Sequence, residues 1–121
     1  MIDTHVHLQS DAYAEDIDAI IQHAVEAGVT PCIVPGTNLS DSYAAVALTE
    51  RSDILYAAVG FHPTNTQTLT PETLAELREL AQHPRVVAIG EIGLDYYWPR
   101  IPNRDWPCAD PVTQREALEV Q

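Results

Sequence analysis

The stretch that decides the fold is RVVAIGE, residues 85–91. Residues 85–90 are almost wholly apolar, which predicts a short strand. A strand without alternating polar residues is typical of a parallel sheet whose two faces are both covered. Glu91 follows directly, so a carboxylate stands at the carboxyl end of this predicted strand.

Three similar stretches come earlier in the chain, and each of the four leads into a segment with helical periodicity. The predicted strands are residues 1–6, 29–34, 54–59 and 85–90, and the predicted helices are residues 13–27, 40–50, 70–81 and 112–121. Gly28 follows the first helix as a C-terminal cap, and Thr70 precedes the third as an N-terminal cap. Strands that alternate with helices predict right-handed βαβ units and a parallel α/β sheet.

This pattern fits an open doubly wound sheet or a barrel, and in both the functional groups gather at the carboxyl ends of the strands. A complete (β/α)8 barrel needs about 250 residues, and this chain of 121 residues supplies about half of that, with no stop signal in its last helix. If the sheet is such a barrel, we expect this chain to be a fragment that supplies about half of it. The two sheet edges of such a half barrel are unpaired, which favours self-association.

The composition excludes several classes of protein. Asp and Glu number 18 against 6 Lys and Arg, and the net charge of −12 repels nucleic acid unless bound cations offset it. No apolar run approaches the roughly 18 residues of a membrane span, and the N-terminus lacks the pattern of a signal peptide, so we expect a cytoplasmic protein. Cys32 and Cys108 fit no zinc or redox spacing.

His5 and His7 lie two residues apart at the end of the first predicted strand. Because side chains alternate along a strand, we expect Asp3, His5 and His7 to share one face and Val6 to lie on the other. Two imidazoles on one face can bind one divalent ion. The alternative is a pair of partly solvated histidines at the mouth of a loop.

Three further residues lie at the carboxyl ends of later strands. Glu91 points into the functional mouth, and a carboxylate there can bridge two metal ions. His62 can hold a phosphate oxygen or move a proton, or it can simply bond a neighbouring backbone group. Asp95 can orient a metal ligand or cap the following turn, and the structural role is favoured.

Four segments resemble one known family along the whole chain and in the same order. They are IDTHVHL at residues 2–8, GFHP at 60–63, AIGEIGLDYY at 88–97 and QREAL at 114–118. Together they resemble the TatD-like deoxyribonucleases, within the wider group of amidohydrolase-type (β/α)8 barrels. The GEIGLD segment is the most specific of the four.

The resemblance implies a single TIM-type (β/α)8 barrel domain, of which residues 1–121 are the N-terminal part. It also implies hydrolysis of phosphodiester bonds in DNA with two divalent metal ions, and it does not distinguish zinc, manganese and magnesium. It implies that His5 and His7 hold one ion, that Glu91 bridges to a second and that His62 lines the substrate mouth. The family completes its site with histidines and an aspartate from later strands, and the present sequence of 121 residues contains none of those strands. We therefore expect this chain alone to be inactive.

Two alternative functions remain open. Other barrels with a His-x-His pair on the first strand cleave amides or lactones, although GEIGLD favours the TatD type. The other alternative is a non-catalytic fragment that self-associates through its open sheet edges.

Overall fold

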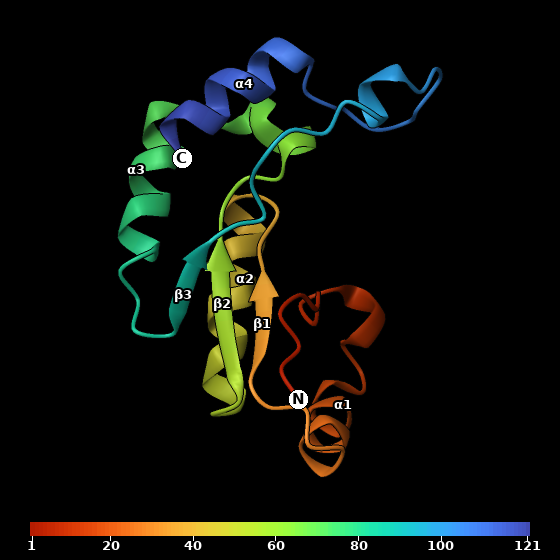
Figure 1. Ribbon diagram of the computed structural model, residues 1–121, viewed down its shortest axis with the longest axis vertical. Coiled ribbons are helices and arrows are strands. Elements are labelled where there is room, and N and C mark those ends of the chain that lie inside the picture. Colours follow the sequence, from red (N-terminus) through yellow and green to blue (C-terminus); the bar gives the residue numbers. More distant parts are fainter.

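The computed structural model describes residues 1–121 and contains one parallel sheet with its connecting helices. The strands β1 (Cys32–Pro35), β2 (Leu55–Val59) and β3 (Val86–Ile89) lie in the order β1-β2-β3 (Figure 1). The helices are α1 (Ile17–Glu26), α2 (Leu39–Leu48), α3 (Pro71–Leu80) and α4 (Pro111–Val120). The 3-10 turns are η1 (Asp11–Tyr13), η2 (Thr49–Arg51), η3 (Pro63–Thr68) and η4 (Trp98–Arg100). The predicted alternation of strands and helices is confirmed.

Local sequence signals fix the helix ends. Thr70 caps α3, and its hydroxyl and that of Thr73 each accept the other residue's backbone N–H, which makes a capping box. Gly28 has φ +72°, the left-handed conformation that ends α1 without strain. The helix predicted from residue 13 begins only at Ile17, because Asp11–Tyr13 form the separate turn η1.

The core lies between the sheet and the helices. Val34, Leu55 and Val59 of the first two strands are fully buried, and Ile21 of α1 and Leu77 of α3 pack in the same cluster. Helix α4 lies beyond the carboxyl ends of the strands (Figure 1). None of the helices has the length and hydropathy that a membrane crossing requires.

Strand β3 forms where the sequence predicts it, but the prediction that both of its faces are covered is wrong. Val87 and Ile89 are 51% and 44% exposed, and Val86 is the strand residue that packs against the core. The physical reason is its place in the sheet: β3 is an edge strand that bonds to β2. Burial of its other face requires elements that residues 1–121 do not place there.

Residues 1–6 lie beside β1, as predicted, but they do not form a regular strand. Asp3 pairs with Cys32 in a single parallel bridge, in which the Asp3 N–H donates to Pro31 O at 3.1 Å and the Ile33 N–H donates to Asp3 O at 2.8 Å. Regular pairing stops at His5, whose N–H turns to the side chain of Asp3 at 3.0 Å. The first strand prediction is therefore right in position and wrong in regularity.

Candidate metal centre

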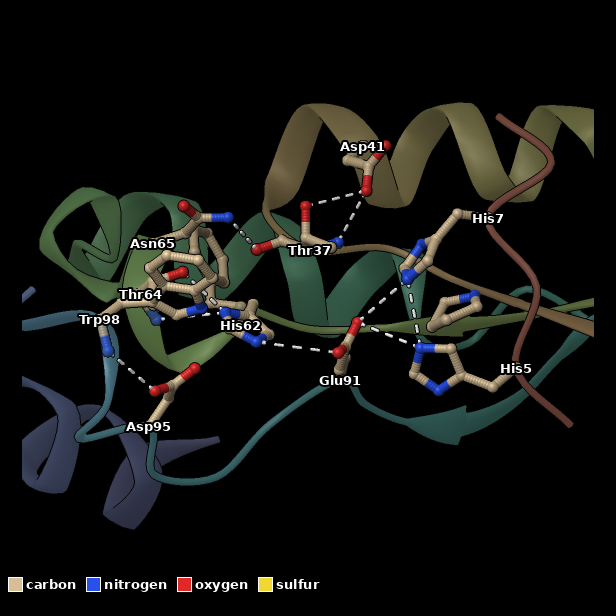
Figure 2. Close-up of polar contacts among 12 residues, drawn as sticks. His5, His7, Thr37, Asp41, His62, Thr64, Asn65, Glu91, Asp95 and Trp98 are labelled. Atoms are coloured by element: carbon tan, nitrogen blue, oxygen red, sulfur yellow. Dashed lines mark hydrogen bonds and ion pairs between the residues drawn. The ribbon is translucent and has the colours of Figure 1, made fainter. Parts of the chain in front are cut away.

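Three segments bring histidine and carboxylate side chains together at the carboxyl ends of the strands. His5 and His7 come from the N-terminal segment, His62 follows β2 and Glu91 follows β3. Figure 2 shows the three rings converging on the Glu91 carboxylate. The structure thus brings all four predicted site residues into one cluster, although His5 and Glu91 are 86 residues apart in the sequence.

His5, His7 and Glu91 offer three donor atoms to a common point. The two Nε2 atoms lie 3.2 Å apart, and Glu91 Oε2 lies 3.5 Å from that of His5 and 3.4 Å from that of His7. These three residues could hold a metal ion together, because their donor atoms all lie within 4.8 Å of one another.

These separations can be tested against the geometry of a bound ion. Two imidazole nitrogens at about 2.0–2.1 Å from a tetrahedral zinc lie about 3.3 Å apart, and a carboxylate oxygen at about 2.0–2.2 Å lies about 3.4 Å from each. The observed distances of 3.2, 3.4 and 3.5 Å match this triangle. One divalent cation therefore fits between the three donors with little movement of the side chains.

The Glu91 carboxylate provides an independent sign that a cation belongs here. Its Oε2 atom is buried and has no hydrogen-bond partner. An unpaired buried carboxylate oxygen is costly, because it has lost its water and gained nothing in exchange. The chemistry of the donor set, two nitrogens around an oxygen that lacks a donor, suits a cation.

His62 faces the same carboxylate from the other side, with its Nε2 at 3.7 Å from Glu91 Oε1. Its Nδ1 accepts the Thr64 backbone N–H at 3.2 Å and lies 2.7 Å from the Thr64 hydroxyl. A nitrogen that accepts a backbone N–H carries a lone pair, so the neutral ring holds its proton on Nε2. His62 therefore points an N–H donor into the site, and its neutral form is no base there.

The loop after Glu91 is held by a buried glutamine of α4. Gln114 Oε1 accepts the Asp95 N–H at 2.7 Å, and Gln114 Nε2 donates to Asp95 O at 2.8 Å and to Ala109 O at 3.0 Å. The Asp95 carboxylate accepts the N–H groups of Tyr97 and Trp98 (Figure 2). Asp95 thus caps a turn, which is the structural role that the sequence favours.

Sequence reasoning missed a polar network behind His7. Gln9 Nε2 donates to Pro35 O at 2.9 Å and to Asp41 Oδ2 at 3.0 Å, and it lies 3.4 Å from His7 Nδ1. Asp41 also accepts the N–H and the hydroxyl of Thr37 at 2.8 and 2.9 Å. The network ties the His7 loop to the start of α2. Gln9 and Asp41 lie 32 positions apart, and no local motif connects them.

The expectation that Asp3 shares a face with His5 and His7 is wrong. Asp3 pairs with Cys32, which is buried in the core, whereas His5 and His7 face Glu91. Val6 lies opposite to His5 and His7, as expected, and packs against the core. The alternation of side chains is therefore broken between Asp3 and Val6.

Proteins of known sequence match this chain over nearly its whole length. A metal-dependent hydrolase named TatD from Mycobacterium tuberculosis is 40% identical over 120 residues, which cover 98% of this chain and 44% of that protein. A protein named 3'-5' ssDNA/RNA exonuclease TatD from Erwinia tasmaniensis is 38% identical over 122 residues, covering 100% of this chain and 44% of that protein. The chain spans less than half the length of these relatives.

Solved structures also match this chain over nearly its whole length. A TatD-family hydrolase from Entamoeba histolytica superposes with a TM-score of 0.85 at 31% identity, covering 98% of this chain and 43% of the other. The TatD homologue YJJV from Escherichia coli superposes with a TM-score of 0.80 at 34% identity, covering 99% and 44%. The predicted fold class, part of a TIM-type (β/α)8 barrel, is confirmed. A family model described as TatD related DNase matches residues 2–121, and the chain therefore belongs to the TatD-related DNase family.

Proposed function

We propose that residues 1–121 are the N-terminal part of a single barrel domain in a metal-dependent hydrolase that cleaves phosphodiester bonds in DNA. The observation that carries the proposal is the triangle of His5 Nε2, His7 Nε2 and the unpartnered Glu91 Oε2. The names of the relatives, a metal-dependent hydrolase and an exonuclease on single-stranded DNA and RNA, support the same class of reaction. The Zn²⁺, Mn²⁺ or Mg²⁺ identity of the ion is left to experiment.

In this proposal the ligands divide between two ions. His5 and His7 would hold one ion, and Glu91 would help to hold both that ion and a second. Bound divalent ions supply an activated water and neutralise the phosphate charge. Such neutralisation is needed here, because a chain of net charge −12 repels a polyanion.

His62 acts on the substrate in this scheme. The Thr64 N–H holds its Nδ1 as an acceptor, which leaves the Nε2–H free to donate to an oxygen of the scissile phosphate. Its backbone is anchored as well, because the His62 N–H donates to Thr37 O at 2.9 Å. His62 thus orients the phosphate through a hydrogen bond, and its donor is fixed before the substrate arrives.

The direct test is calorimetric titration of the chain with Co²⁺ and with Zn²⁺. We expect binding by the wild type and a loss of at least tenfold in affinity in the double variant His5→Ala/His7→Ala and in Glu91→Gln. His23→Ala is the matched control, because His23 is an exposed histidine on α1. Equal affinity in all four proteins would remove the three residues as ligands.

Turnover by the 121-residue chain alone should be at most a trace. Three ligands cannot fill the coordination of two ions, so the ions need donors from other parts of a whole barrel. The assay is release of nucleotides from a fluorescent single-stranded oligonucleotide with Mn²⁺ or Mg²⁺. Robust turnover that EDTA abolishes would contradict the idea that this ligand set is incomplete.

We also infer that the isolated chain self-associates through a second copy. The edge strand β3 exposes Val87 and Ile89 and presents unpaired backbone groups, which template a further strand. Light scattering should then give a mass above 13.3 kDa that falls to this value in the variant Val87→Lys/Ile89→Lys. A wild-type chain that remains monomeric at high concentration would rule this out.

A further inference from the structure

We propose that Asp3 is a positioning residue whose carboxylate takes the His5 N–H away from the sheet and thereby turns His5 and His7 toward Glu91. The proposal deepens the metal site proposed above and rests on it for its consequence in metal binding. Its geometrical part, the orientation of the two rings, stands independently of any ion.

The hydrogen bonds around Asp3 show where the pairing changes. In a regular parallel ladder, a residue that bonds Pro31 O and the Ile33 N–H is followed, two positions later, by one whose N–H donates to Ile33 O. That residue would be His5. The donor to Ile33 O is instead Val6, at 3.1 Å, and the His5 N–H donates to Asp3 Oδ1 at 3.0 Å. The segment therefore contains one extra residue, which is a β-bulge.

One extra residue reverses which side chains face the core. Asp3 pairs with the buried Cys32, so regular alternation from Asp3 would send His5 and His7 toward the core. The structure shows the opposite: Val6 and Leu8 pack in the core. The bulge thus places Val6 and Leu8 against the core and both histidines at the functional site.

The Asp3 side chain is suited to hold this bulge. A carboxylate only accepts hydrogen bonds, and its bond to a backbone N–H is charge-assisted and stronger than a neutral one. It satisfies the donor that the bulge removes from the ladder, in a hydrogen bond that solvent can reach. Asp3 pairs with Cys32 at the start of β1, and its charge adds to the effect of burial in raising the pKa of the Cys32 thiol.

The first experiment measures ring orientation in the metal-free chain by NMR. The Nε2 atoms of His5 and His7 lie 3.5 and 3.4 Å from Glu91 Oε2, which brings the ring protons close enough to the Glu91 side-chain protons for cross-relaxation. We expect this contact in the wild type and in Asp3→Asn, whose amide oxygen still accepts the His5 N–H, and its loss in Asp3→Ala. Persistence in Asp3→Ala, or loss in a folded Asp3→Asn, would overturn the proposal.

The second experiment titrates the same proteins with Co²⁺. We expect Asp3→Ala to bind about 10- to 100-fold more weakly, as for other partners that orient metal ligands, and Asp3→Asn to bind nearly as the wild type. Asp110→Ala is the control for lost stability, because Asp110 caps α4 far along the chain and should leave Co²⁺ affinity unchanged. Unchanged Co²⁺ affinity in Asp3→Ala would refute its consequence for metal binding.

Two further results distinguish the role of Asp3 from the proposed metal binding. If Asp3→Ala does not fold, protection of the wild-type His5 amide from hydrogen exchange decides, and free exchange would refute the bond to Asp3. If the wild type binds no Co²⁺ but shows the ring contact and loses it in Asp3→Ala, the proposed metal function fails and the role of Asp3 stands.

Discussion

Replacing Gln114 by methionine tests how firmly α4 holds the loop that follows Glu91. Methionine has nearly the same length and volume, so the change removes hydrogen bonds without leaving a large cavity. Gln114 is fully buried, and its amide makes three hydrogen bonds, two to the backbone of Asp95 and one to Ala109 O. The two bonds to Asp95 are part-buried and the bond to Ala109 O is buried, so water replaces the lost partners only in part.

The expected loss follows from these contacts. Each hydrogen bond contributes about 0.5–1.5 kcal/mol, and buried groups left without a partner push the cost toward the upper end. Three bonds give about 3 kcal/mol, a large share of the roughly 5–15 kcal/mol that stabilises a typical domain.

Urea denaturation followed by circular dichroism measures the effect. We expect a lower midpoint with an unchanged m-value, because the surface exposed on unfolding stays the same. Gln67→Met is the matched control, because Gln67 is exposed on η3 and should change the free energy of unfolding very little. A loss below about 1 kcal/mol in Gln114→Met would refute the reasoning from buried hydrogen bonds.

Three further predictions concern other parts of the chain. Gly36→Ala should destabilise the fold by about 1–3 kcal/mol, because a Cβ there overlaps the backbone and hydroxyl of Ser42, and an unaltered thermal midpoint would contradict this. Leu55→Ala removes a fully buried side chain of the central strand and should cost about 2–5 kcal/mol in urea unfolding, so a smaller loss would mean that the site collapses around the gap. Hydrogen bonds from the Thr113 hydroxyl and from backbone N–H groups lower the pKa of Asp110, so its stabilisation is full above the ordinary value of 3.8 and is lost as the pH falls through the folded pKa. Asp110→Ala should therefore differ from the wild type in stability at pH 7 but less at pH 2.5, and a gap independent of pH would exclude this role.

Elements set by local chemistry could be predicted from the sequence. The Thr70 cap and the Gly28 end of α1 depend on a few neighbouring residues, and both form as expected. The convergence of His5, His7 and Glu91 was also predictable, because the carboxyl ends of parallel strands meet at one edge of the sheet. Their roles as metal ligands stay a prediction for the titrations above.

Features that depend on distant groups could not be predicted. Exposure of Val87 depends on what covers the sheet, and nothing in residues 85–90 carries that information. The bulge between Asp3 and Val6 replaces a backbone acceptor by a side chain, which a period-two pattern cannot represent. The network of Gln9 and Asp41 joins residues from two separate units of the fold.

The double attachment of Gln114 has a consequence for how this protein can be altered. Because the Gln114 amide binds the backbone at Asp95 and again at Ala109, both ends of the segment between these two residues are held in fixed positions. Within that segment the Arg104 side chain donates hydrogen bonds to the carbonyls of Trp98, Pro99 and Ile101, so the segment packs against itself. The interior of this segment can therefore be replaced by foreign sequence, while Glu91, four residues before Asp95, keeps its orientation.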